Sequence, residues 1–112
     1  CWASDKVITN YMNAHGISSY PELLAMYVER VGDIASDLGT TSIFWEDTFI
    51  AGVRPPMTSI FDVWTDSTQI ANVTSAGYQV IAAPQDYWYL DHSDNTWIKM
   101  YEYDKKQSLE IS

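Results

Sequence analysis

Segments with helical periodicity alternate along this chain with short β-branched and aromatic runs, and this alternation most strongly limits the possible folds. Parallel strands need a crossover connection, because a tight hairpin can join only antiparallel strands. Strands separated by crossovers, with apolar residues on both faces, predict a parallel sheet covered by helices, which is α/β architecture. The three strands expected here leave two sheet edges open, which argues for missing neighbours.

Helical spacing and capping signals predict two helices before the first strand. Residues 4–15 carry an apolar stripe and end at Gly16, which can adopt the left-handed conformation of a helix terminus. Ser19 and Glu22 form a capping box, in which the hydroxyl and the carboxylate satisfy each other's free backbone amides. The helix that follows repeats apolar residues at helical spacing as far as Gly39, and we expect it to cover a sheet.

β-branched and aromatic runs predict strands over 41–45, 59–64 and 78–82. Glycine and proline residues after the first of these runs break regular structure, so the first connection is expected to be mostly loop. A short helix over 67–76 is expected to connect the second strand to the third.

The composition suits one folded unit and excludes several classes of function. With 112 residues, 46% of them apolar, the chain can bury a core, and we expect 1–112 to be a single segment with a frayed tail at 104–112. The net charge of −9 and the scattered basic residues give no footprint for nucleic acid. No apolar run approaches the roughly 20 residues that cross a bilayer. We therefore expect no nucleic acid and no membrane as partners.

The chain has no recognisable signature of a metal or cofactor. Cys1 is the single cysteine, and no cysteine and histidine residues have metal-ligand spacing. The glycines are isolated caps and turns, without a phosphate loop, dinucleotide fingerprint or nucleophile elbow. We expect no metal and no cofactor. The glycosylation sequon Asn72-Val73-Thr74 favours a lysosomal or secreted protein.

Each predicted strand carries aromatic residues at or just beyond its carboxyl end. Trp45 and Trp64 end the first two strands, and Tyr87-Trp88-Tyr89 follows the third. Ligands bind at this end of parallel strands, where the loops converge. A sugar packs a C–H face on an aromatic ring, while its hydroxyls need fixed donors and acceptors nearby, such as Asp91, Glu46 or Asp47. The pattern predicts a carbohydrate site, and aromatic plugs of the core are the alternative.

Other polar residues give weaker signals. Glu46 and Asp47 are adjacent, and neighbours in a strand point to opposite faces, so a joint role as acid and base is not expected. For Asp62, inside the second strand, a solvated edge position or a structural hydrogen bond is a simpler interpretation than a functional carboxylate. His15 lies at a helix end, and His92 lies beside the aromatic loop, where it could reach a ligand.

A series of landmarks along the chain resembles glycoside hydrolase family 20, the β-N-acetylhexosaminidases. They are Cys1-Trp2-Ala3-Ser4, the helix from Ser19, Ile43-Phe44-Trp45-Glu46-Asp47, Val63-Trp64 and Trp88-Tyr89-Leu90-Asp91. The Trp-Tyr-Leu-Asp run is the most specific of them. The resemblance covers nearly the whole chain and implies an internal part of the family's (β/α)8 TIM barrel, with about three parallel strands and their covering helices.

The family resemblance implies retaining hydrolysis of terminal N-acetylglucosamine or N-acetylgalactosamine from glycans, assisted by the substrate's own acetamide oxygen. By this resemblance Tyr89 would donate its hydroxyl to the acetamide carbonyl in catalysis. Trp45 and Trp64 would wall the acetamide methyl group, and Asp91 would accept from sugar hydroxyls.

Several family landmarks are absent from these residues. They are the His-x-Gly-Gly-Asp-Glu motif, expected just upstream of Cys1, the Trp-Gly-Glu landmark and the first-strand arginine. Without the general acid of that motif we expect the isolated chain to be inactive. Its expected partners are N-acetylhexosamine-terminated glycans and the remainder of the barrel or another chain.

Two further interpretations remain open. One is a non-catalytic module that binds N-acetylhexosamine and keeps only the aromatic wall. The other is an α/β interaction domain whose open sheet edges pair with a partner, with the aromatic residues as interface anchors.

Overall fold

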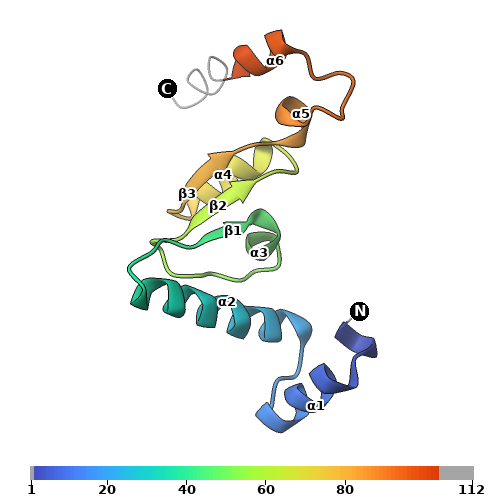
Figure 1. Ribbon diagram of the computed structural model, residues 1–112, viewed down its shortest axis with the longest axis vertical. Helices are drawn as coiled ribbons and strands as arrows, with labels where there is room; N and C mark the ends of the chain where they lie inside the picture. The colour runs from blue at the N-terminus through green and yellow to red at the C-terminus, as the bar shows by residue number, and fades with distance from the viewer. Residues whose placement is uncertain (1, 104–112) are drawn as a thin grey trace.

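The computed structural model describes residues 2–103, so the frayed tail predicted at 104–112 lies outside the described residues. At its centre is a sheet of three parallel strands in the order β1-β2-β3, namely β1 (Ile43–Trp45), β2 (Ile60–Val63) and β3 (Gln79–Ala82) (Figure 1). The prediction of an α/β fold with a parallel sheet is confirmed. Each observed strand begins later than the sequence predicts.

Helices precede, connect and follow the strands. They are η1 (Trp2–Ser4), α1 (Lys6–His15), α2 (Tyr20–Asp37), α3 (Glu46–Ile50), α4 (Thr68–Ser75), α5 (Gln85–Trp88) and α6 (Trp97–Tyr101). The sequence predicts α1, α2 and α4 but not the short helices α3, α5 and α6. The molecule is elongated, with extents of 53 × 32 × 23 Å, and α1 and α6 lie at opposite ends (Figure 1). Within the described residues, no helix combines the length and hydropathy needed to span a membrane.

Polar side chains cap the amino-terminal ends of the two long helices. Asp5 caps α1 through its carboxylate, so this helix begins later than predicted, and Gly16 ends it with a φ of 69°. At α2, Ser19 Oγ accepts from the Glu22 amide at 3.3 Å. The Glu22 carboxylate instead accepts from the backbone amide of Ser18 at 2.8 Å and from its hydroxyl at 2.9 Å, and these bonds lower the Glu22 pKa. The predicted capping box is therefore half formed, because Ser18 offers the carboxylate two donors.

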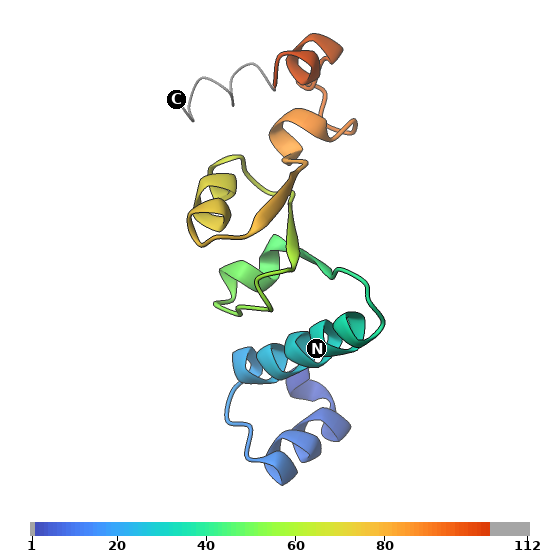
Figure 2. The same ribbon diagram turned by 90° about the vertical axis from the view of Figure 1, so that its left-hand side faces the viewer.

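The hydrophobic core lies on the face of the sheet that α4 covers. Phe61 and Val63 of β2, Val73 of α4 and Tyr78 are buried together there. The Phe61 and Tyr78 rings meet edge to face, with centroids 5.0 Å apart. Figure 2 shows α3 and α4 on the same side of the sheet. The side chains of this core hold β2 and β3 against α4.

The opposite face of the sheet is open. Trp45 and Ile81 pair in register with Asp62 on either side of it, and alternate residues of a strand point to opposite faces. These residues therefore face away from the core, and Trp45 and Ile81 are 59% and 41% exposed. The interior of a closed barrel would bury such a face.

α2 does not cover a face of the sheet, and the prediction that it does is wrong. It packs against the connection between α3 and β2, where a Cβ added at Gly32 would lie 3.1 Å from Pro56 Cδ (Figure 1). Val28 is 2% exposed on the packed side, whereas Tyr27 and Leu38 of the predicted apolar stripe are 60% and 73% exposed. The stripe is only partly buried because a narrow segment of loop, and not a sheet, lies against it.

Candidate functional site

Aromatic residues from successive strand ends line one open pocket. Trp45 ends β1, Trp64 follows β2 and Tyr89 follows α5, and together with Asp47 of α3 they line a hollow of about 320 Å³. The Trp64 and Tyr89 rings have centroids 6.3 Å apart and planes inclined by 30°. The structure thus brings together Trp45, Trp64 and Tyr89, which the sequence singles out as site residues.

The rings of this pocket present surface to solvent. Trp45 is 59% exposed, and Trp64 and Tyr89 are half-buried. The core cluster around Phe61 lies on the other face of the sheet, so these rings do not serve as its plugs. Aromatic faces next to a carboxylate suit a ligand that is apolar on one side and hydroxylated on its edge, as a sugar ring is.

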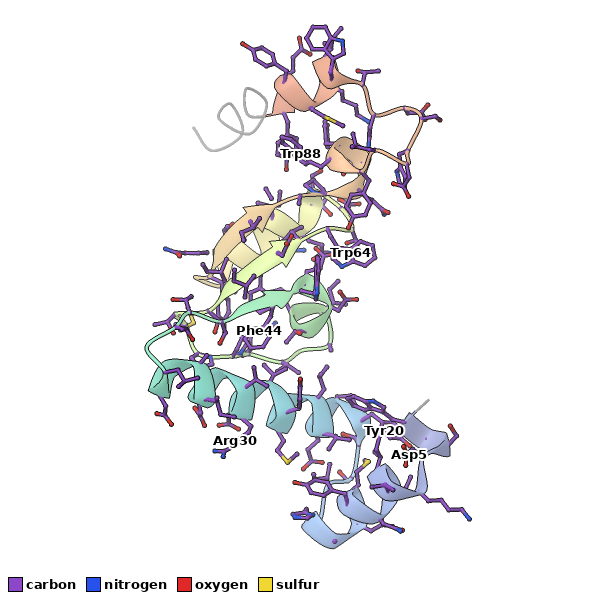
Figure 3. The ribbon with its side chains drawn as sticks, viewed as in Figure 1. Asp5, Tyr20, Arg30, Phe44, Trp64 and Trp88 are labelled. Atoms are coloured by element: carbon purple, nitrogen blue, oxygen red, sulfur yellow. The ribbon has the colours of Figure 1, made fainter. Side chains whose placement is uncertain are left out.

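A hydrogen bond connects the Trp64 ring to α3. The indole Nε1 donates to Asp47 Oδ2 at 2.9 Å. Figure 3 shows Trp64 at the end of β2, beside α3. Asp47 lies in the first turn of this helix, which begins directly after Trp45. The predicted strand ends at Trp45, as β1 does, so the expectation that Glu46 and Asp47 point to opposite faces of a strand does not apply to them. The helical turn is what directs Asp47 towards the indole.

Glu46 is buried and connects α3 to the residue after Trp64. Its Oε1 accepts from the Thr65 backbone amide at 3.0 Å and also from the Thr65 hydroxyl. Its other oxygen is buried without a hydrogen-bond partner among the described residues. At 0% exposure, Glu46 does not contribute to the surface of the pocket. Glu46 and Asp47 therefore bind Thr65 and Trp64, respectively, which are the two residues directly after β2.

Tyr87 and Trp88 of the aromatic run lie outside the pocket. Their rings pack against Tyr103, with centroid distances of 4.7 Å for Tyr87 and 5.9 Å for Trp88. In Figure 3 Trp88 lies near α6, away from Trp64. Of the predicted aromatic run, Tyr89 alone lines the pocket. Tyr87 and Trp88 belong to the helical turn α5, whereas Tyr89 follows it, so these neighbouring side chains point in different directions.

Asn95 fixes the backbone at Tyr89, and the sequence gives no signal for this role. Its Nδ2 donates to the carbonyl oxygens of Gln85 at 2.7 Å and of Tyr89 at 2.8 Å. Its Oδ1 accepts from Lys99 Nζ at 3.1 Å. A single amide side chain therefore joins both ends of α5 to α6.

Asp91 lines a separate hollow. This residue is exposed and borders a space of about 380 Å³ together with Asp86, His92, Asp94 and Lys99. The structure does not bring Asp91 into the pocket of Trp45, Trp64 and Tyr89, although it lies only two residues after Tyr89. The His92 ring is 6.1 Å from the Tyr89 ring, on the side of this second hollow.

Asp62 lies on the central strand β2, so the predicted edge position is wrong. Its Oδ1 is buried and has no hydrogen-bond partner among the described residues. Burial raises the pKa of Asp62 above its ordinary value of 3.8. Within residues 2–103, no three histidine, cysteine, aspartate or glutamate side chains form a group that could hold a metal ion.

Known proteins match the chain along almost its full length. The model of the family described as glycosyl hydrolase family 20, catalytic domain, matches residues 1–111. The chain belongs to glycosyl hydrolase family 20. The resemblance carried by the ordered tryptophans and the Trp-Tyr-Leu-Asp run is thus confirmed.

The family 20 relatives are β-hexosaminidases, which are glycoside hydrolases. Beta-hexosaminidase subunit B1 of Dictyostelium discoideum is 27% identical over 113 residues, which cover 100% of this chain and 20% of that protein. Beta-hexosaminidase 3 of Arabidopsis thaliana is 31% identical over 110 residues, which cover 97% of this chain and 20% of that protein. Beta-hexosaminidase subunit beta of Homo sapiens is 31% identical over 109 residues, which cover 91% of this chain and 19% of that protein. The chain therefore spans about one fifth of the length of these relatives.

Proposed function

We propose that this chain is part of a β-N-acetylhexosaminidase and supplies the wall of the pocket that receives the substrate's acetamide group. The observation that carries the proposal is the hollow lined by Trp45, Asp47, Trp64 and Tyr89. Membership of family 20 supports glycans ending in N-acetylglucosamine or N-acetylgalactosamine as substrates. The reaction proposed is retaining hydrolysis in which the acetamide oxygen attacks the anomeric carbon. Lysosomal or secreted location is part of the same proposal.

Tyr89 is the proposed catalytic group of this segment. Its phenol hydroxyl is a directional donor, and it donates to the acetamide oxygen as charge develops on the acetamide group during attack. The ring lies against Trp64, and Asn95 Nδ2 binds the Tyr89 carbonyl oxygen at 2.8 Å. Contacts on both its ring and its backbone therefore restrict the position of the hydroxyl.

Trp45 and Trp64 are the proposed wall for the acetamide methyl group. Their indole rings lie at neighbouring strand ends and expose apolar surface to the hollow. Apolar rings around the methyl group exclude water from the reacting acetamide, which strengthens electrostatic interactions there. Asp91 borders the second hollow, two residues after Tyr89, and in this proposal it accepts from sugar hydroxyls that extend beyond the acetamide pocket.

The described strands are proposed to be part of a (β/α)8 barrel, with residues 1–112 as a single segment of it. The support is the parallel order β1-β2-β3, the helices on one face and the open opposite face that carries Trp45 and Ile81. In a barrel this open face is the interior, and ligands bind at the carboxyl ends of the strands, where Trp45 and Trp64 lie. The remainder of the barrel, or another chain, is the proposed partner.

The chain by itself is proposed to lack turnover. Its 112 residues contain no Asp-Glu sequence, so the acid that protonates the leaving group in this proposal is absent from them. Loss of a general acid costs a factor of about 10² to 10⁴ in rate. A chromogenic N-acetylglucosaminide assay checks this point, and robust hydrolysis by the chain alone would contradict it. A non-catalytic module that binds N-acetylhexosamine is the second candidate, favoured by the aromatic hollow of Trp45, Trp64 and Tyr89.

Calorimetric titration with N-acetylglucosamine tests the proposed function. We expect the wild-type chain to bind this sugar more tightly than glucose, which lacks the acetamide. Trp64→Ala should weaken the binding of N-acetylglucosamine by about tenfold or more, because it removes the wall. Trp97→Ala is the matched control, since Trp97 is 75% exposed on α6 and does not line the pocket. Equal affinities of the wild type and Trp64→Ala, or no binding by the wild type, would reject the proposal.

A further inference from the structure

We propose that Asp47 is a positioning residue that fixes the Trp64 indole as the wall of the acetamide pocket, an inference that rests on the proposed function. The carboxylate accepts from the indole Nε1 at 2.9 Å, and both residues line the same hollow. Asp47 therefore acts on the ligand through the orientation of the Trp64 ring.

The hydrogen bond selects one orientation of a ring that is otherwise only half-buried. An indole turns about two side-chain torsions, and solvent-exposed rings exchange rotamers easily. A bond from its N–H to a carboxylate is charge-assisted and directional, so it disfavours the other rotamers. With the N–H directed at Asp47, the Trp64 plane keeps its inclination of 30° to Tyr89. The apolar face of the indole then remains available to the methyl group.

The surroundings of Asp47 hold its carboxylate in place. Glu46, the residue before it, is buried and binds Thr65 N at 3.0 Å, so the backbones next to Asp47 and next to Trp64 are tied together. On the other side of Asp47, the Phe49 ring meets Phe61 edge to face with a centroid distance of 5.6 Å. The helix that carries Asp47 is thus anchored to the core and to the end of β2.

The first measurement is the indole N–H resonance of Trp64 in nitrogen-edited NMR spectra, assigned by its absence in Trp64→Phe. In Asp47→Ala we expect this resonance to move upfield and its hydrogen exchange to speed up about tenfold, as the N–H loses its acceptor. Asp47→Asn keeps an oxygen that can accept, so it should restore part of the shift. Asp37→Ala removes an exposed carboxylate of α2 and should change nothing. An unchanged Trp64 resonance in Asp47→Ala would overturn the inference.

The second measurement is the affinity for N-acetylglucosamine, arranged as a double-mutant cycle. We expect Asp47→Ala to weaken binding about tenfold in the wild-type background and to have little effect in Trp64→Phe, where no indole N–H remains to be held. Equal effects in both backgrounds would reject Asp47 as a positioning residue. Equal affinities of the wild type and Asp47→Ala would reject it too, while leaving the proposed function intact. Absence of binding by the wild type would reject both proposals at once.

Discussion

The Trp64 indole and the Tyr89 phenol ring lie with their centroids 6.3 Å apart and their planes inclined by 30°. Trp64 follows β2 and Tyr89 comes after β3, and the pairing of these strands sets Val63 opposite Ala82. The proximity of the two rings therefore depends on the register of the sheet. In the proposed function, the Trp64 ring contacts the methyl end of the acetamide group while the Tyr89 hydroxyl binds its oxygen.

Tyr89→Phe removes the phenol hydroxyl and keeps the ring, so it tests the contribution of the hydroxyl alone. The phenylalanine ring can keep its place against Trp64, so we expect the free energy of unfolding to change by less than about 0.5 kcal/mol. The affinity for N-acetylglucosamine should fall about tenfold, the size of a lost hydrogen bond of about 1.4 kcal/mol. Calorimetry measures this affinity. Tyr27→Phe, at a position on α2 that is 60% exposed, is the control, and equal affinities of the two variants would count against the role of the Tyr89 hydroxyl.

Glu46→Ala should destabilise the chain by about 2 to 3 kcal/mol, because it leaves a cavity and removes the acceptor of the Thr65 amide and hydroxyl. Glu46→Gln fills the same space and keeps an oxygen that can accept from Thr65, so its cost should be smaller. Urea unfolding gives these free energies. Glu29→Ala removes an exposed glutamate of α2 and should be almost neutral. Similar costs for Glu46→Ala and Glu29→Ala would show that the buried contact contributes nothing.

Asp62→Asn should stabilise the chain at neutral pH. Burial raises the pKa of Asp62, so the folded state holds this proton to higher pH than the unfolded chain does, and stability falls as pH rises above the ordinary value of 3.8. The asparagine has no charge to bury, so its advantage over the wild type should shrink as the pH falls towards 3.8 and should be small below that value. Thermal unfolding between about pH 3 and neutral pH measures the difference.

Asp66→Asn is the control of opposite sign for this pH series. The Thr68 backbone amide lowers the pKa of Asp66, donating to its Oδ1 at 2.7 Å, so the ionised carboxylate favours the folded state above the ordinary pKa. The wild type should therefore be the more stable protein at neutral pH in this comparison. If both substitutions stabilised the protein at neutral pH, the gain at Asp62 would not be specific to a buried carboxylate. That result would contradict the assignment of Asp62 as a carboxylate destabilised by burial.

Phe61→Ala should cost about 3 to 5 kcal/mol of unfolding free energy, the usual range for a buried aromatic side chain. Phe61 is 0% exposed, and its ring contacts Phe49 and Tyr78 at centroid distances of 5.6 and 5.0 Å. Phe61→Leu refills part of the space and should cost less than half as much. Chemical denaturation measures both, and a cost for Phe61→Ala below about 1 kcal/mol would mean that the core does not centre on this ring.

The short helix α3 shows where sequence patterns stop being informative. Its five residues, Glu46–Ile50, directly follow a strand. A helix of this length completes barely more than one turn, so it has no apolar period that a sequence pattern could reveal. Its geometry is nevertheless what places Asp47 next to Trp64. α2 shows a related limit, since periodicity predicts which of its residues could be buried and not whether a sheet or a loop would lie against them.

The sequence by itself determined the parallel α/β class, the two long helices, the aromatic residues at strand ends and the family, because periodicity, capping and ordered motifs are local properties of the chain. Only the tertiary structure decided that Trp45, Trp64 and Tyr89 share a pocket while Asp91 borders another, and that Asp47 holds an indole 17 residues away. The physical reason is that such contacts depend on strand register and on the direction of each turn, which arise when distant segments pack.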